Sequence, residues 1–344
     1  MDYSGDLNVY RNEMTQLLTY PDIDPQQWQA LIDRSPYATW FQTKEAYEFY
    51  AANPDEMTPF AVGIVENGHL AGVIVGYTTQ EKNPIKQLLT CRSIIIGGPL
   101  LDEHISSDAI SALLVAVKRV TKNSIYLETR NFHSYAQWQS VFEANGFTYQ
   151  PHLNFHQDCT KENILSSMSE SRRRQIKKAI KNGVEIVEAS SIKEVKAFYD
   201  ILFDLYRNKI KTPLFAWTFF KDFYIQSYGK YFLVKYQDTI IGGIMCPILQ
   251  GKAIYEWFVC GLDDVYKNQY PSVMATYAAI EYANKHNIPL FDFMGAGKPR
   301  EAYGVREFKA RFGGELVEHG RFLCVRKPLL YWIGKMGVKI LKRR

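Results

Sequence analysis

Residues 291–314 read FDFMGAGKPREAYGVREFKARFGG, the most unusual stretch of the chain. An apolar, strand-like segment ends in a loop that holds two glycines, Gly295 and Gly297, and two cations, Lys298 and Arg300. Glycine lets the backbone approach a ligand closely, and cations beside it favour an anionic ligand. A connecting loop would also be rich in turn residues, and the GxxxxGK[ST] and GxGxxG spacings are absent. Together with the basic charge around it, the pattern favours a binding loop.

The end of this stretch resembles a segment in the first half of the chain. Residues 141–147 read VFEANGF and residues 307–313 read EFKARFG, at an offset of 166 positions. Gly72 and Gly242, each within a predicted hairpin, lie 170 positions apart. Two similar offsets, with the same order of predicted elements around them, indicate that one α+β unit is duplicated.

Hydrophobic periodicity predicts alternating helices and strands in both halves. The predicted helices cover residues 42–52, 106–122, 135–144, 193–207, 216–226, 272–286 and 306–311. The predicted strands cover residues 60–66, 70–77, 124–129, 231–236, 239–247, 253–260 and 290–294. The first strand pair turns at Asn67-Gly68, a strong hairpin dipeptide. We therefore expect an α/β (α+β) fold with one domain over residues 1–155, a second over 156–325, and a basic amphipathic helix over 326–344.

Length and composition agree with two globular domains. The 344 residues are 47% hydrophobic and 22% charged, and the formal net charge is +5. Residues 1–150 hold 10 basic and 17 acidic residues, whereas residues 151–344 hold 31 and 19. This division suggests a polyanionic partner for the second half. Five scattered cysteines without a CxxC pair, and the lack of a secretory signal or long apolar run, predict a cytoplasmic protein.

Two further basic segments each allow two interpretations. Residues 169–183 hold six cations beside an apolar stripe, as in a solvated helix face or a phosphate-binding surface. Ser169 or Ser171 would begin this helix, and Gly183 would end it. Residues 326–344 hold seven basic residues and no acid, with apolar residues at helical spacing. That helix either packs on the protein with a solvated basic face or lies on an anionic membrane.

Motifs for covalent or metal-dependent catalysis are missing. The sequence has no GxSxG and no HExxH, and His152 and His156 have a zinc-like spacing without a cysteine pair. Asp263-Asp264 follows a predicted strand and is more typical of a solvated turn than of a general base. We therefore expect neither a bound metal nor a covalent enzyme intermediate.

The chain resembles the FemABX family of peptidoglycan-bridge aminoacyltransferases, which have two tandem GNAT-like domains, each a mixed, mostly antiparallel sheet flanked by helices. The specific part of the resemblance is the block formed by Asp292-Phe-Met-Gly295 and Phe308-Lys309. Further matching positions are 172–176, 178–179, 183–184, 229–232, 242–243, 255–257, 271, 304 and 312–313, with 41–42, 44, 98–99 and 102 in the first half.

The resemblance implies transfer of an aminoacyl group from aminoacyl-tRNA to an amine on a UDP- or lipid-linked peptidoglycan precursor, without a cofactor. It implies that Phe308 and Lys309 are the functional pair, with Lys309 at the phosphate-bearing end of the acyl donor. Arg207 resembles an arginine that holds precursor phosphate, although residues 207–214 depart from the family's pattern. The remaining expected substrate-binding residues are Lys44, Asp102, Tyr255, Trp257, Gly295, Lys298 and Arg300.

Two other functions remain open at this point. A GNAT-type N-acyltransferase would use acyl-CoA or an acyl carrier protein, but residues 261–271 and 97–102 lack the usual pyrophosphate loop. A membrane-surface nucleic-acid-binding protein would explain the basic patches but not the Phe308-Lys309 block. The expected partners of the enzyme are the precursor and tRNA, with peripheral contact to an anionic membrane through residues 326–344, and the expected state is a monomer.

Overall fold

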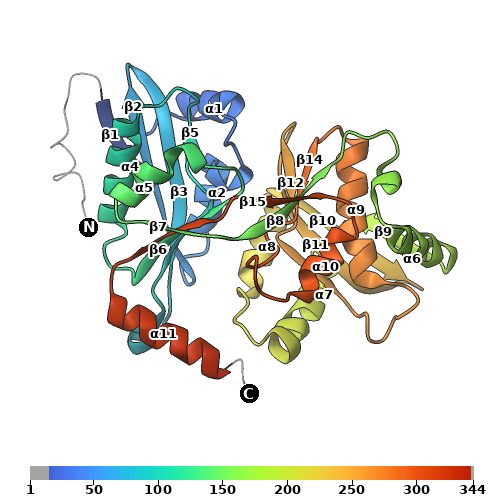
Figure 1. Ribbon diagram of the computed structural model, residues 1–344. Coiled ribbons are helices and arrows are strands. Elements are labelled where there is room, and N and C mark those ends of the chain that lie inside the picture. Colours follow the sequence, from blue (N-terminus) through green and yellow to red (C-terminus); the bar gives the residue numbers. More distant parts are fainter. Residues whose placement is uncertain (1–14, 342–344) are drawn as a thin grey trace. The chain divides into compact units, whose positions relative to one another are not determined.

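The computed structural model describes residues 15–341, which divide into two compact units. Unit 1 comprises Met1–Pro151 and His319–Arg344, and unit 2 comprises His152–Glu318. Each unit is built on a mixed, largely antiparallel sheet with helices packed on it (Figure 1). This architecture confirms the expected α/β class and the duplication of one unit.

Unit 1 holds most of the first half of the chain and the C-terminal segment. Its strands are β1 (Thr15–Thr19), β2 (Met57–Glu66), β3 (His69–Thr79), β4 (Ser93–Gly97), β5 (Leu100–Leu101), β6 (Tyr126–Asn131), β7 (Thr148–Gln150) and β16 (Arg321–Val325). Its helices are α1 (Pro25–Arg34), η2 (Trp40–Gln42), α2 (Lys44–Ala51), α3 (Pro84–Thr90), α4 (Ser107–Val120), η3 (Ala136–Trp138), α5 (Gln139–Ala144) and α11 (Pro328–Leu341). The strand order is β1-β2-β3-β4-β6-β16-β7, with β5 beside β3.

Unit 2 repeats this arrangement. Its strands are β8 (Leu153–Asp158), β9 (Val184–Glu188), β10 (Gly229–Tyr236), β11 (Thr239–Leu249), β12 (Ala253–Tyr255), β13 (Phe258–Gly261), β14 (Leu290–Asp292) and β15 (Glu315–Glu318). Its helices are η4 (Ile164–Ser167), α6 (Glu170–Lys181), α7 (Ile192–Leu205), the π-helical η5 (Tyr206–Ile210), α8 (Trp217–Ile225), α9 (Pro271–Lys285) and α10 (Gly304–Ala310). The strand order is β9-β10-β11-β12-β14-β8-β15, with β13 beside β11.

The duplication extends to the detail of the main hairpins. In each unit the register shifts once, between Ile64 and Val65 opposite Gly72, and between Val234 and Lys235 opposite Gly242. The first hairpin turns at Asn67-Gly68, where both residues have positive φ, as the short turn of a twisted hairpin requires. Gly72 and Gly242, which lie 170 positions apart in the sequence, therefore occupy equivalent positions opposite the two bulges.

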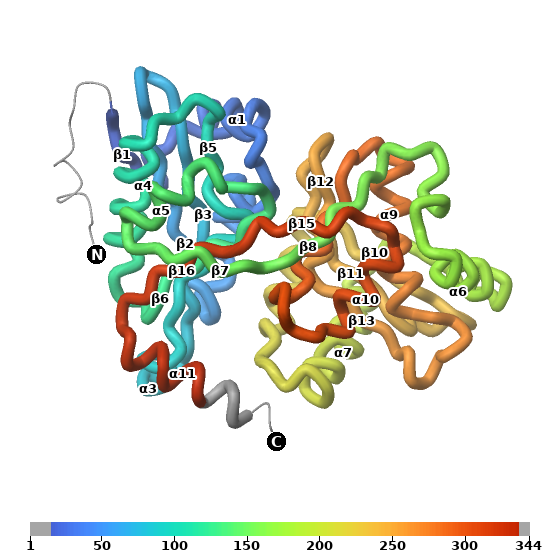
Figure 2. The backbone as a smooth tube through the Cα atoms, viewed as in Figure 1, coloured from blue at the N-terminus to red at the C-terminus, as the bar shows by residue number. Residues whose placement is uncertain are grey.

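The two units exchange their last strands. In unit 1, β16 pairs with both β6 and β7, although about 170 residues separate it from β7 along the chain. In unit 2, β8 pairs with both β14 and β15. Figure 2 shows the green and red segments running side by side within each sheet. In a simple tandem arrangement β8 would complete the first sheet and β16 the second. Here β16 lies in the sheet of unit 1 and β8 in that of unit 2.

This exchange corrects the expected domain boundaries. Residues 319–325 belong to unit 1, not to a second domain that ends at residue 325, and unit 2 begins at His152. The charge division changes with it, because unit 1 then holds 18 basic and 17 acidic residues and unit 2 holds 23 and 19. The contrast between a net −7 and a net +12 therefore does not describe the folded units.

One predicted strand is interrupted at the place that matters most for the site. The sequence predicts a single strand over residues 253–260, but the structure has β12 and β13, separated by Glu256 and Trp257. Strand β12 pairs in parallel with β14 up to Tyr255 and Asp292, whereas β13 pairs with β11. The sheet thus opens between β13 and β14 beyond the last pair of residues.

Candidate functional site

The opening between β13 and β14 is the centre of the candidate site in unit 2. At its closed end, the Glu256 amide donates to the Asp292 carbonyl at 2.9 Å. The next amide, of Trp257, turns away and donates to the Met245 carbonyl of β11 at 3.1 Å. One strand therefore leaves the other within two residues, and the side chain of Glu256 stays in the opening.

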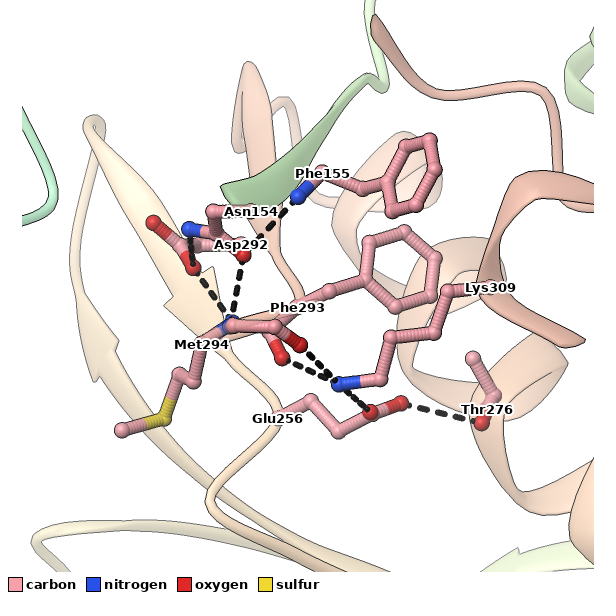
Figure 3. A network of polar contacts seen from close by, with 9 residues as sticks. Asn154, Phe155, Glu256, Thr276, Asp292, Phe293, Met294 and Lys309 are labelled. Atoms are coloured by element: carbon pink, nitrogen blue, oxygen red, sulfur yellow. Dashed lines mark hydrogen bonds and ion pairs between the residues drawn. The ribbon is translucent and has the colours of Figure 1, made fainter. Parts of the chain in front are cut away.

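Lys309 fills this opening from α10 (Figure 3). Its Nζ donates to the carbonyls of Phe293 at 2.6 Å and Gly295 at 3.0 Å, and lies 3.0 Å from Oε1 of Glu256. The second carboxylate oxygen of Glu256 accepts from the Thr276 hydroxyl of α9 at 3.0 Å. Lys309 is 8% exposed and Glu256 5%. A lysine ammonium has three N–H donors, so all of them have acceptors in this arrangement.

The loop between Phe293 and Lys298 has an unusual backbone. Met294, Gly295 and Gly297 have φ values of 57°, 130° and 77°, and the value at Gly295 is open to glycine but not to other residues without strain. Its carbonyls point toward the cations of α10. Arg306 donates to the carbonyls of Ala296, at 2.8 Å, and Lys298. Arg306 and Lys309 thus hold four carbonyls of this loop.

Strand β8 holds the other side of the same loop. The Asn154 amide donates to Asp292 at 2.7 Å, while its oxygen accepts from the Gly295 amide at 2.7 Å. The Asp292 carboxylate also accepts from the Met294 amide at 2.6 Å and from Nε2 of His156 at 3.1 Å. The exchanged strand therefore fixes the start of the loop 293–298, which the sequence did not predict.

Asp292 and His156 form a buried ion pair. Burial raises the pKa of Asp292, but the hydrogen bond and charge of His156 outweigh it and hold the pKa below its ordinary value. Burial lowers the pKa of His156, but the hydrogen bond and charge of Asp292 bring it above the ordinary value. The two groups stabilise each other's charged forms.

Phe308 of α10 contacts Arg172. The guanidinium carbon of Arg172, on α6, lies 4.5 Å from the ring centre of Phe308 and 4.3 Å from that of Phe312. Arg172 also donates to the Phe308 carbonyl at 2.8 Å and to Gln175 at 2.8 Å. Burial, followed by the charge of Arg311, lowers the pKa of Arg172 to about 10, so it remains a cation at neutral pH. This buried cation thus links α6 to α10 through a hydrogen bond and its contact with the Phe308 ring.

The rest of α6 is partly buried and partly solvated. It begins at Ser169, whose hydroxyl accepts from the Arg172 amide at 3.3 Å, and Gly183 follows its end with a φ of 82°. Arg172 is buried, and Arg173 donates to the Met168 carbonyl at 2.6 Å. Two of the six cations thus serve the fold, and the exposed ones are Arg174, Lys177, Lys178 and Lys181.

Exposed cations lie beside the loop. Lys298 and Arg300 are exposed, and Lys298 pairs with Glu301 at 3.3 Å. Arg207 is exposed in the π-helical turn η5, next to Tyr206. The Tyr303 phenol contributes to raising the pKa of Tyr206, after burial and Cys260, so the two segments lie near each other.

The other expected residues fall in different environments. Tyr255 is 1% exposed and belongs to the core of unit 2, whereas Trp257 is partly exposed within an aromatic cluster with Phe219 and Phe258. In unit 1, Lys44 forms an ion pair with Glu48 at 2.7 Å. Asp102 forms an ion pair with Arg34 at 2.6 Å. Burial raises the pKa of Asp102, but the hydrogen bond from Arg34 outweighs it and leaves it below normal.

Sequence reasoning missed four residues of the site. They are Asn154, Glu256, Thr276 and Arg306. Glu256 stood between Tyr255 and Trp257, and a lone carboxylate in an apolar strand would have been a usable signal. Within residues 15–341, no group of three or more His, Cys, Asp or Glu side chains could hold a metal ion.

Comparison with known proteins shows a family match and similar folds. The model of the FemAB family matches residues 131–230 and 241–338. A crystal structure of FemX is similar with a TM-score of 0.70, at 16% identity over 93% of this chain and 100% of the other. The C-terminal domain of a putative lysylphosphatidylglycerol synthetase from Agrobacterium fabrum gives 0.54, at 13% identity over 79% and 86%. A tandem GNAT protein from the clavulanic acid biosynthesis pathway gives 0.55, at 9% identity over 90% and 98%. No curated protein matches the chain in sequence.

Proposed function

The chain belongs to the FemAB family, and we propose that it transfers an aminoacyl group from aminoacyl-tRNA to an amine of a peptidoglycan precursor. The family match across both units carries this proposal. The amine nitrogen attacks the ester carbonyl carbon, a C–N bond forms, and the C–O bond to the ribose breaks. The attacking amine gives up a proton and the ribose oxygen takes one up. No metal or covalent enzyme intermediate enters this scheme.

We place the reacting ester at the opening between β13 and β14. The loop 293–298 forms one wall, and its position is set by Lys309, Arg306 and Asn154. Rate acceleration in such a reaction comes mainly from holding donor and acceptor in register and from stabilising the developing charge. Lys309 contributes as a positioning residue, because its donors already hold the loop and Glu256. Phe308 contributes through its contact with Arg172.

The exposed cations are assigned to the polyanionic substrates. Lys298 and Arg300 would contact phosphates of the donor, and Arg207, in the neighbouring turn, would hold precursor phosphate. Trp257 would contact the transferred group, and Gly295 allows its close approach. Lys44 in unit 1 is a weaker candidate for the acceptor, and Asp102 is bound by Arg34. We propose that the enzyme works in the cytoplasm, where its proposed donor is found, as a monomer.

The alternative donor is an acyl-CoA or an acyl carrier protein. In that case the pyrophosphate would bind at the N-terminus of the helix that follows β13. In this chain the Asp263 carboxylate already occupies the start of α9, where it accepts from the Ser272 amide at 3.2 Å and from its hydroxyl. A carboxylate at that position repels a pyrophosphate, which favours the tRNA donor.

The test compares donors under single-turnover conditions. Purified protein is mixed with a radiolabelled pool of aminoacyl-tRNA or with radiolabelled acetyl-CoA, each with UDP-linked and lipid-linked precursors as acceptors. We expect label to reach the precursor from aminoacyl-tRNA and not from acetyl-CoA. Transfer from acetyl-CoA alone would replace the proposal with the GNAT-type alternative.

A further inference from the structure

Two helices of unit 1 expose large apolar side chains. In α3 these are Ile85, Leu88 and Leu89, which are 72%, 56% and 40% exposed. In α11 they are Leu329, Trp332, Ile333 and Met336, which are 71%, 60%, 43% and 41% exposed. We call these seven side chains the apolar surface. The spacing is i, i+3, i+4 in α3 and i, i+3, i+4, i+7 in α11, so each helix presents one apolar stripe.

The apolar residues of α3 have no role in the core. None of the seven residues of the helix is buried. Polar contacts hold it instead, since Asn83 accepts from the amides of Ile85 and Lys86 at 3.0 and 3.1 Å, and Gln87 donates to the Thr79 carbonyl at 3.1 Å. The helix borders an open cavity of about 980 Å³ in unit 1. Folding therefore does not explain why α3 carries three large apolar side chains.

Helix α11 is fixed to unit 1 by its other face. The Tyr331 ring lies 5.4 Å from the Tyr126 ring of β6, and Lys327 donates to the Asn123 carbonyl at 2.8 Å. At Gly334 the backbone comes close to α3, because a Cβ atom there would lie 3.9 Å from the Leu89 carbonyl oxygen. The two helices are thus neighbours, although their first residues, Pro84 and Pro328, are 244 positions apart in the sequence (Figure 2).

The C-terminal segment that contains α11 has a basic sequence. Residues 319–344 hold eight basic residues and no acidic one. Lys335 lies 5.0 Å from the Tyr331 ring centre on α11 itself. On the α3 side, Lys82 pairs with Asp55 and Lys86 with Glu81. The excess of cations in unit 1 therefore comes from the sequence of the C-terminal segment, and in the described part of α11 and the residue before it the cations are Lys335 and Lys327.

We propose that the apolar surface docks unit 1 onto a bilayer that contains anionic phospholipid, with α11 lying in the plane of the interface. Apolar side chains flanked by cations are the pattern that anionic interfaces bind. A second copy of this chain would instead bring two basic segments together, which like-charge repulsion opposes. None of the helices among residues 15–341 is long and apolar enough to cross a membrane.

Vesicle sedimentation with the full chain tests this directly. The probes are sucrose-loaded vesicles of phosphatidylcholine alone or with 30% phosphatidylglycerol, a composition chosen to give an anionic surface on the order of that of a bacterial membrane. We expect binding to the anionic vesicles and much weaker binding to the neutral ones. Lys335→Gln should lower binding about fivefold, the factor that corresponds to ~1 kcal/mol for one cation near an anionic surface.

The decisive variants remove apolar contacts on each helix separately. One double variant carries Ile85→Ser and Leu88→Ser, and the other carries Leu329→Ser and Trp332→Ser. Each should bind the anionic vesicles about tenfold or more weakly, because two large apolar side chains that would be buried in the bilayer are missing. Val265→Ser, at a 72% exposed position of unit 2, is the matched control and should bind like the natural chain. All these side chains are exposed, so unfolding curves should coincide.

Three outcomes would overturn the proposal. The first is that the chain does not bind the anionic vesicles, and the second is that the α3 double variant binds them as well as the natural chain does. The third is that sedimentation velocity without vesicles shows a dimer, and that the double variants disrupt this dimer. The last would assign the apolar surface to a second copy of the chain. The readout is vesicle binding, so it does not depend on the proposed aminoacyl transfer.

Discussion

The Lys309 ammonium group lies 3.0 Å from the Glu256 carboxylate, at the point where β13 and β14 separate. The two residues are 53 positions apart in the sequence and come from a helix and a strand break. Both are almost fully buried, so each charge depends on the other. This pair closes the opening of the sheet and connects α10, which carries Phe308 and Lys309, to the loop beside the proposed site.

Replacing Lys309 separates its structural and functional roles. Lys309→Met should lower the free energy of unfolding by about 3 kcal/mol or more, because it leaves Glu256 buried without a counter-charge. Lys309→Met with Glu256→Gln should recover most of that loss in urea unfolding. Turnover should stay at least ~10²-fold below that of the natural chain in both variants, because the loop carbonyls lose their donor. If the double variant regained full turnover, Lys309 would be needed for stability alone.

Arg306 is expected to hold the loop closed against protease. Arg306→Ala removes the donor to the Ala296 and Lys298 carbonyls. Tryptic cleavage after Arg300 should become about tenfold faster, since losing a charge-assisted hydrogen bond of ~1.5 kcal/mol shifts local opening by that factor. Mass spectrometry of the fragments gives the rate. Equal cleavage rates would mean that Arg306 does not hold the loop.

Arg172 should not tolerate lysine. Arg172→Lys loses the planar contact with the Phe308 and Phe312 rings and the two hydrogen bonds to α10 and Gln175. We expect a loss of about 1–3 kcal/mol in the free energy of unfolding. Arg174→Lys, on the exposed face of the same helix, is the matched control and should change stability by less than ~0.5 kcal/mol. Similar losses in the two variants would contradict a bracing role for Arg172.

The His156–Asp292 pair predicts a pH dependence of stability. The pKa of His156 is raised in the folded protein, so its contribution is fully present below the unfolded value of about 6.5 and is lost as pH rises through the folded value. His156→Gln keeps a donor toward Asp292 but not the charge. The stability difference between the natural chain and this variant should therefore be larger at pH 5.5 than at pH 9. Urea unfolding at both pH values measures it, and a constant difference would show that the pair is not ionised.

Arg207 should act on acceptor binding. It is exposed, so Arg207→Ala should leave unfolding unchanged while raising the KM for the precursor by about tenfold, the loss expected for one charge-assisted contact to phosphate. The KM for the acyl donor should not change. Lys181→Ala, at an exposed cation of α6, serves as the control. An unchanged precursor KM would remove Arg207 from the acceptor site.

Local patterns predicted the parts of the fold that depend on local forces. The Asn67-Gly68 turn, the alternation in its two strands and the helix that begins at Ser169 follow from neighbouring residues. The strand exchange could not be read in this way, because β16 finds β6 and β7 through pairing across most of the chain. The assignment of residues 319–325 to the second domain, and with it the charge division, was wrong for that single reason.

The sequence predicted which segments form the candidate site but not which side chains contact each other there. Phe308, Lys309 and the glycine loop were identified together, whereas the Glu256 partner lies in a strand that sequence reasoning left unbroken. Arg172 could have been recognised, because it shares a helix face with Ile176 and Ala179 at spacings of four and seven. Arg172 stands beside two further arginines of the same chemistry, and only its position on the apolar face of the helix distinguishes it from them.

The most direct test of the central claim is single-turnover transfer from radiolabelled aminoacyl-tRNA to a peptidoglycan precursor. The account predicts that label appears in the precursor with the natural chain, at least ~10²-fold more slowly with Lys309→Met/Glu256→Gln, and not at all from acetyl-CoA. Transfer from acetyl-CoA without transfer from aminoacyl-tRNA would contradict it.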